Sequence, residues 1–365
     1  MRNAIYQVHL WCGVLIGGFL AFQGITGSAV AFRHAGNHWL HEEEMIVAPQ
    51  DAPMIPMSGV LESFSAAFPD IPHNVLSVMY PLAPDEAYFI RVWRDGAPAP
   101  NMYVSMNPYT GEITGYGSKW DYPFELMFRL HEQLSAGTPG ITLVHWGGFL
   151  MSLMCLTGLY VWWPRRESLK QALGIKTRPL KRFLFTAHRA IGAYTFVLVF
   201  VVAFSGTMIF GVLSLIPGLN DAPSGFVMAS ATMLKPGEIT GDPVPVDQII
   251  ETARTYFPDD TLRDLSYIRL MRAVCVASFI DEDGPNPRAL NRVFFERHTG
   301  NVINVVDWED LEGVRLIEDW AIPVHSGEII GAPGRFLVLI SGLLMPFLFV
   351  TGLWLWFKKQ RVRSQ

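Results

Sequence analysis

Two stretches of equal length decide the fold: residues 131–163, HEQLSAGTPGITLVHWGGFLMSLMCLTGLYVWW, and residues 325–357, HSGEIIGAPGRFLVLISGLLMPFLFVTGLWLWF. Each begins with a histidine, passes through a Gly-x-Pro-Gly sequence and continues as an apolar run. Matching residues stand 194 positions apart throughout. The matches are His131 and His325, Gly137 and Gly331, Pro139 and Pro333, Gly140 and Gly334, Thr157 and Thr351, Gly158 and Gly352, and Trp162 and Trp356. The chain therefore contains one membrane module twice.

The helix that begins each module carries a second repeated histidine. His9 is followed by glycines four and eighteen positions later, and His188 is followed by glycines at the same two offsets. These glycines are Gly13 and Gly27 in the first copy, and Gly192 and Gly206 in the second. Close packing of helix backbones, or of a flat ring system against a helix, would explain them.

Four stretches are long enough to cross a bilayer, which requires about 20 predominantly apolar residues. They cover residues 10–32, 140–163, 190–213 and 336–357, and none of them contains Asp, Glu, Lys or Arg. Half of all residues are hydrophobic and 13% are aromatic, which is typical of a membrane protein. We expect four transmembrane helices, in contact with membrane lipid.

Basic residues close to the membrane predict the orientation. The connector after the second span is basic, whereas residues 33–131 hold 5 basic and 12 acidic residues and residues 221–328 hold 9 and 19. We therefore expect both termini in the cytoplasm and both large loops in the periplasm, with the protein in the bacterial inner (cytoplasmic) membrane. The expected segments are transmembrane helices at 1–33, 131–164, 187–215 and 325–358, periplasmic domains at 34–130 and 216–324, a connector at 165–186 and a tail at 359–365.

The two loops repeat as well. A helical pattern leads to Phe68-Pro69 in the first and to Phe257-Pro258 in the second, and Gly111 and Gly300 follow 43 residues later in each. Alternating, β-rich runs lie between these landmarks. Each Thr-Gly pair predicts a tight turn after a strand, because glycine accepts positive φ. We expect an α+β unit in each loop, with one helix packed on a small antiparallel sheet.

The helix that ends in Phe-Pro, the strand that ends in Asn107-Pro-Tyr-Thr-Gly111-Glu, and the flanking His…Gly…Thr-Gly helices resemble the PepSY-associated transmembrane family. The resemblance covers nearly the whole chain, although the second turn has Arg297-His298 where the first has Pro108-Tyr109. This family comprises iron-regulated inner-membrane proteins, among them ferric-siderophore reductases of the FoxB type. The resemblance implies four transmembrane helices, two periplasmic PepSY-like α+β domains and bound b-type haem.

The four repeated histidines are candidate axial ligands of haem iron. His9 and His188 open the first and third helices, whereas His131 and His325 precede the second and fourth. Bis-histidine ligation needs two imidazoles from different helices at one depth, and the duplication supplies one such pair at each face of the membrane. The chain has no Cys-x-x-Cys-His motif, so we expect two non-covalent b haems. Histidines that only hydrogen bond between helices are the alternative interpretation.

Five further residues bear on these sites. His145 lies inside the second span, opposite Leu339 of the second copy, and an intramembrane histidine is a functional candidate. It is therefore an alternative outer ligand to His131. Arg189 on the inner side and Arg129 on the outer side are candidates to neutralise haem propionates, as are Arg33 and Arg335; ordinary anchoring at the interface is an equal alternative.

A separate histidine group follows the first span. His34, His38 and His41 would share one face of a helix and precede an acidic run, Glu42 to Glu44. This spacing is compatible with a metal ion, although a solvated polar linker is the simpler interpretation.

The sequence therefore predicts a transmembrane electron-transfer protein, and the resemblance implies an oxidoreductase acting on iron. The resemblance implies a ferric siderophore as substrate. No flavin or nicotinamide fingerprint is present, so electrons must come from a separate donor, a flavoprotein or quinol. We expect no nucleic-acid partner. The alternatives are a non-redox PepSY binding or regulatory protein, a component of siderophore transport, and a haem protein with another electron acceptor, such as copper or a quinone.

Overall fold

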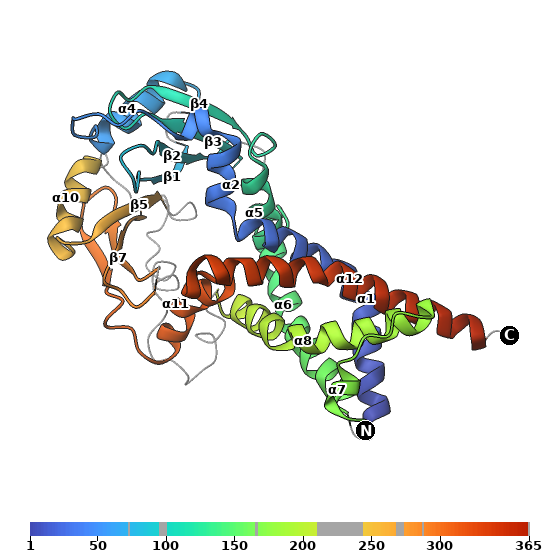
Figure 1. Ribbon diagram of the computed structural model, residues 1–365. Coiled ribbons are helices and arrows are strands. Elements are labelled where there is room, and N and C mark those ends of the chain that lie inside the picture. Colours follow the sequence, from blue (N-terminus) through green and yellow to red (C-terminus); the bar gives the residue numbers. More distant parts are fainter. Residues whose placement is uncertain are drawn as a thin grey trace. The chain divides into compact units, whose positions relative to one another are not determined.

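The computed structural model (Figure 1) describes residues 1–71, 74–94, 101–164, 167–209, 244–267, 274–286 and 288–363. The predicted end of the third span, at 210–215, and the start of the basic connector, at 165–166, lie outside the described residues. The chain divides into two compact units. One comprises Met1–Arg33, Met127–Phe210 and Trp320–Gln365, and the other comprises His34–Leu126 and Gly211–Asp319.

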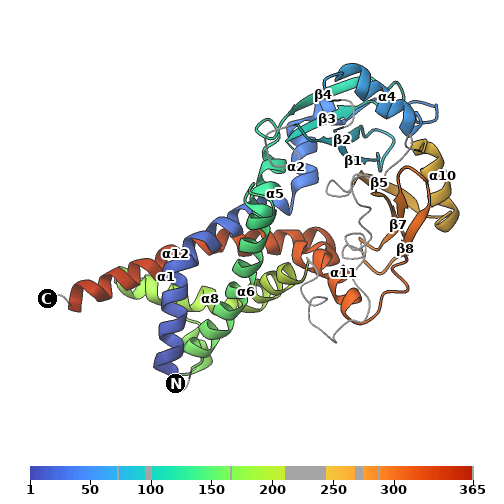
Figure 2. The same cartoon turned by 180° about the vertical axis from the view of Figure 1, so that it is seen from behind.

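Four long helices form the first unit, called the helical unit below. They are α1 (Arg2–Val30), α6 (Thr138–Trp162), α8 (Leu180–Met208) and α12 (Gly331–Arg363). All four are long and apolar enough to cross a membrane, as the sequence predicts. In Figures 1 and 2, α1 packs on α12 and α6, and α8 packs on the same two helices. Apolar side chains such as Leu15, Val197 and Val350 are exposed on these helices, as lipid-facing positions must be.

Small residues bring α1 and α12 into backbone contact. A Cβ added to Gly24 would lie 2.6 Å from the Gly342 carbonyl oxygen, and one added to Gly342 would lie 2.4 Å from the oxygen of Gly24. Beside this crossing, the Ser28 hydroxyl donates a hydrogen bond of 2.9 Å to the Leu339 carbonyl oxygen. Close approach at small residues and polar bonds between helices are the usual means of helix association in lipid.

Two helices lead into the spans α6 and α12 and end in the repeated histidines. These helices are α5 (Pro123–Gln133) and α11 (Gly313–Ser326), and a short 3-10 helix, η3 (Glu328–Ile330), follows α11. Gly137 and Gly331, which begin the spans, have φ values of 68° and 66° with ψ of −144° in both. Only glycine adopts this conformation without strain. The repeated glycines therefore set the angle at which each histidine helix meets its span.

The second unit, called the sheet unit below, contains one antiparallel sheet with the strand order β4-β3-β2-β1-β5-β6-β7-β8. The strands are β1 (Val75–Met79), β2 (Tyr88–Val92), β3 (Met102–Met106), β4 (Ile113–Ser118), β5 (Thr261–Tyr267), β6 (Val274–Ile280), β7 (Leu290–Glu296) and β8 (Val302–Val306). Helices α4 (Met57–Ala67) and α10 (Val246–Tyr256) bury Phe64 and Ile249 in the same core as Ile90 and Val293 of the strands. The short helices α2 (Arg33–Leu40) and α3 (Glu42–Met45) follow α1, and α7 (Leu169–Ala172) lies in the connector.

The sheet differs from the sequence prediction in one respect. We expected a small sheet in each loop, but β1 pairs with β5 through Ser77–Ser266, Val78–Leu265 and Met79–Asp264, so the two sets of four strands form one sheet. Joining them removes two exposed strand edges, which would otherwise leave unpaired backbone groups. The two Thr-Gly turns are confirmed, because Gly111 and Gly300 have φ of 73° and 72°. The second turn therefore forms with Arg297 and His298 in place of Pro108 and Tyr109.

Candidate functional site

The structure brings His131 and His325 together. Because the sequence predicts these two on the periplasmic side, they are called the outer pair below, and His9 and His188 are called the inner pair. His131, in the last turn of α5, and His325, in the last turn of α11, have ring centroids 5.9 Å apart and ring planes inclined by 37°. Two imidazoles on opposite sides of one metal ion, each with a bond of about 2 Å to the metal, have centroids roughly 6 Å apart. The separation of these two rings is therefore compatible with a shared ion.

Hydrogen bonds to neighbouring spans orient both outer rings. His131 Nδ1 lies 3.1 Å from the Gln23 carbonyl oxygen of α1, and His325 Nδ1 lies 2.7 Å from the Val202 carbonyl oxygen of α8. A carbonyl oxygen only accepts a hydrogen bond, so each Nδ1 carries the proton and donates it. The second ring nitrogen, Nε2, then keeps its lone pair. Histidines that bind metals are commonly held in this way, with one ring nitrogen donating to a protein oxygen and the other free to bind the metal.

The rings of the inner pair are also oriented by hydrogen bonds, in which a threonine hydroxyl takes the place of the backbone carbonyl. His9 Nδ1 lies 3.3 Å from Thr157 Oγ1 and His188 Nδ1 lies 2.9 Å from Thr351 Oγ1. Each threonine hydroxyl donates its own proton to a carbonyl one turn earlier, at 2.9 Å and 2.7 Å respectively. The threonine oxygen is thus left to accept from Nδ1, and Nε2 again keeps its lone pair. A ring contact joins His131 to His325, whereas none is described between His9 and His188, so the pairing of these two stays a prediction.

A glycine lies beneath every one of the four rings. A Cβ added to Gly27 would lie 2.7 Å from His131 Cε1, and one added to Gly206 would lie 2.7 Å from His325 Cε1. At the inner end, Cβ atoms on Gly158 and Gly352 would lie 3.0 Å and 3.3 Å from Cε1 of His9 and His188. The repeated glycines therefore admit the imidazoles into the bundle.

The two histidine pairs lie at opposite ends of the helical unit. On α1, His9 is 18 residues from Gly27, which lies against the ring of His131. On α8, His188 is likewise 18 residues from Gly206, which lies against the ring of His325. At 1.5 Å per residue this is about 27 Å along the helix axis. The hydrocarbon core of a bilayer is about 30 Å thick, so one pair belongs near each face.

One buried polar side chain near the outer pair was not singled out from the sequence. The side-chain amide nitrogen and oxygen of Gln23 are both buried and, among the described residues, neither has a hydrogen-bond partner. Its backbone oxygen accepts from His131. The second copy has Val202 at the corresponding place, which is the signal that would have drawn attention to Gln23. An unpartnered buried amide indicates a polar group that the protein alone does not supply.

The remaining candidates take different positions. His145 is half-buried in α6, next to the exposed Trp146. The ring contact at the outer site is made by His131 and His325, and His145 takes no part in it. This geometry favours His131 over His145 as the outer candidate.

Three of the four candidate arginines have carboxylate partners in the helical unit. Arg129 pairs with Glu132 at 3.2 Å, Arg335 pairs with Glu328 at 3.5 Å, and Arg189 pairs with Glu167. Arg33 lies over the Phe128 ring, 4.1 Å from its centroid. A role in neutralising propionates would require Arg129 and Arg189 to exchange these partners, so it stays a prediction.

The three histidines after the first span separate in the structure. His34 and His38 lie side by side with Glu86, whereas His41 stacks on Tyr122 at 4.3 Å between centroids and lies 3.4 Å from Glu44 Oε1. The hydrogen bond from His34 lowers the pKa of Glu86, and burial, followed by the charge of His34, lowers the pKa of His38. The expected grouping of His34, His38 and His41 on one helical face is therefore wrong, because α2 ends at Leu40.

A model of the family described as PepSY-associated TM region matches residues 6–359. The chain belongs to this family. The match includes all four repeated histidines, and with the four apolar helices it identifies a membrane protein. A comparison with curated proteins gives no match.

Proposed function

We propose that this PepSY-associated protein is a bacterial inner-membrane electron-transfer protein with two b haems, and that it reduces ferric siderophore in the periplasm. The observation that carries the proposal is the shared orientation of four imidazoles. In two pairs, at opposite ends of one bundle, Nδ1 donates to a protein oxygen and Nε2 keeps its lone pair.

The donor set fits haem b. Neutral imidazole nitrogens are the usual protein ligands of haem iron, and the hydrogen bond at Nδ1 increases the basicity of Nε2. Beside the inner pair, a Cβ added to Gly192 would meet nothing within 4 Å, so a flat group has space against α8. Beside the outer pair, the buried amide of Gln23 offers a donor and an acceptor. Haem bound at both ends would supply one-electron carriers near the two faces of the membrane.

The protein's own residues have three tasks in this proposal. His9 and His188 hold the inner group, and His131 and His325 hold the outer group. The threonine and carbonyl acceptors keep the four rings in fixed orientations, which lowers the rearrangement that accompanies each electron transfer. The apolar side chains of the spans exclude water from the region between the two ends.

The substrate follows from iron chemistry and from the family. Siderophore oxygens bind hard Fe³⁺ far better than the softer, less charged Fe²⁺, so reduction by one electron releases the metal. We assign the siderophore to the sheet unit, whose two four-stranded halves we interpret as PepSY-like domains that arose with the helices by internal duplication. The electron donor would be a separate flavoprotein or quinol on the cytoplasmic side.

A reduced-minus-oxidised spectrum of the purified chain, with a pyridine haemochrome count, tests the proposal. We expect a sharp α band and about two haems per chain. Replacing both His9 and His188 by Leu should remove about half of the haem and leave the outer signal. A colourless protein, after expression with ample haem supply, would reject the proposal in favour of a non-redox binding or regulatory role.

A further inference from the structure

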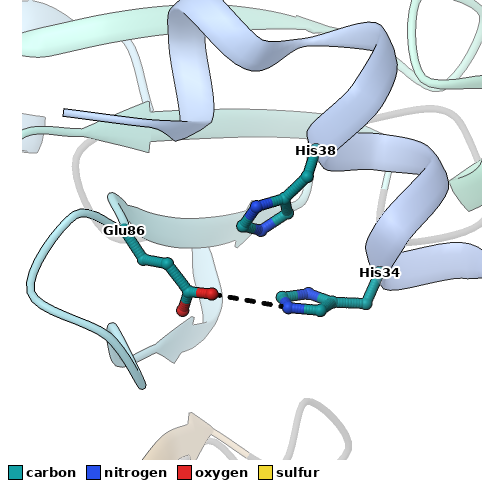
Figure 3. Close-up of side chains that lie close together, drawn as sticks. All are labelled: His34, His38 and Glu86. Carbon is teal, nitrogen blue, oxygen red and sulfur yellow. Dashed lines mark ion pairs between the residues drawn. The ribbon is translucent and has the colours of Figure 1, made fainter.

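Two imidazoles and a carboxylate converge in the sheet unit. His34 and His38 project from α2, and Glu86 projects from the loop that precedes β2 (Figure 3). One ligand atom from each of these residues lies within 4.8 Å of the other two. His34 Nε2 is 3.5 Å from Glu86 Oε1, and the two imidazole centroids are 4.2 Å apart.

The local structure holds these groups in place without any ion. Residues four apart on a helix lie on one face, so α2 presents the two imidazoles together. The Glu86 carboxylate is fixed from its other side, because Oε2 accepts a hydrogen bond of 3.0 Å from the Leu82 backbone nitrogen. The backbone of Glu86 is anchored as well, by a β-bridge to Ile46 and a hydrogen bond of 3.1 Å to the Ala83 carbonyl oxygen.

The contact is also open enough to receive a ligand. The His34 side chain is 63% exposed, whereas that of Glu86 is 17% exposed. Donor atoms bound to one metal ion lie roughly 3–4 Å apart, since each bond is about 2 Å long. His34 is the exposed member of the three, whereas His38 and Glu86 are partly buried, so His34 has the most room to move towards a bound ion. Open coordination positions would remain for water or a further ligand.

We propose that His34, His38 and Glu86 bind a divalent transition-metal cation. Two imidazoles with one carboxylate form a donor set that suits Zn²⁺ and Fe²⁺, whereas Mg²⁺ and Ca²⁺ prefer oxygen ligands alone. Asp85 adds negative charge next to His38. The site stands on this geometry and does not depend on the proposed reductase activity.

Metal titration of the purified, chelator-stripped chain tests this site. Isothermal titration with Zn²⁺, and anaerobic titration with Fe²⁺, should each detect a site that Mg²⁺ does not fill. His34→Ala, His38→Ala and Glu86→Gln should each weaken binding at this site by at least 10- to 100-fold, the loss typical even for an outer-shell partner of a metal. Glu86→Gln retains an oxygen for the Leu82 nitrogen, so it removes charge without removing the loop contact.

His41→Ala is the matched control, because His41 is a neighbouring histidine whose contacts are with Tyr122 and Glu44. It should bind Zn²⁺ as the unaltered chain does. Equal Zn²⁺ affinity in the unaltered chain, His34→Ala and His38→Ala would overturn the proposal and leave an ordinary hydrogen-bonded pair. The haem count of every variant is measured in parallel. Unchanged metal affinity with normal haem rejects only the metal site, whereas absent haem with normal metal binding rejects only the reductase.

Discussion

The contact between Gly27 and His131 offers the sharpest test of the described histidine geometry. In Gly27→Ala the new Cβ would lie 2.7 Å from Cε1 and 3.1 Å from Nδ1 of the imidazole. Ordinary contacts begin at 3.4 Å, so the ring must retreat by about 0.7 Å, the shortfall between these two distances, or α1 must shift. A ring displaced this far strains the 3.1 Å hydrogen bond from His131 Nδ1 to the Gln23 oxygen.

The expected cost follows from packing and hydrogen-bond energies. Overpacking a well-packed site costs about 1–3 kcal/mol, and leaving a buried donor without its partner costs about 1–3 kcal/mol more. Replacing glycine by alanine within a helix stabilises the helix by up to ~1 kcal/mol, because alanine has the higher helix propensity. Gly18→Ala, in the same helix, is the matched control, since its Cβ would lie 3.5 Å from Phe349 Cζ. We expect Gly18→Ala to be neutral or slightly stabilising. Because the propensity gain is common to both variants, Gly27→Ala should be less stable than Gly18→Ala by about 1–3 kcal/mol if the His131 hydrogen bond is kept and by about 2–6 kcal/mol if it is lost.

Thermal unfolding in detergent, followed by circular dichroism, measures this difference. Adding His131→Ala removes the ring that the new methyl group meets, so Gly27→Ala should cost nothing in that background. If Gly27→Ala and Gly18→Ala unfold at the same temperature, or if His131→Ala fails to relieve the cost, the imidazole does not lie against α1 as described. Loss of the outer haem signal in Gly27→Ala alone would extend the result to the proposed function.

Two further predictions concern the histidine ligands. Thr351→Val removes the acceptor 2.9 Å from His188 Nδ1 at nearly constant volume, so haem at the inner site should bind about 10- to 100-fold more weakly. Thr351→Ser keeps the hydroxyl and should bind haem normally. Equal haem retention in both variants would contradict the role of the hydroxyl. His131→Leu should abolish the outer haem spectrum and His145→Leu should preserve it, because the outer ring pair joins His131 to His325; the opposite result in low-temperature difference spectra would make His145 the ligand.

The sequence by itself determined the four spans, the repeated register of the histidines and the Thr-Gly turns. These features depend on composition and on neighbours within a few residues, where length, helical period and the conformational range of glycine suffice. Even Gly137 and Gly331, recognised only as a repeated pair, have their positive φ dictated by the chain turn in which they lie.

Only the tertiary structure decided which groups meet. Gln23 and Val202 became the acceptors for two imidazoles through packing between helices more than a hundred residues apart, and carbonyl groups leave no signature in a sequence. The pairing of β1 with β5 joined strands that the sequence assigns to separate loops. His38 lies beside Glu86, whereas His41 stacks on Tyr122. These contacts depend on where α2 ends and on the position of the loop before β2. Such partners are selected by the packing free energy of the whole unit, which no local pattern contains.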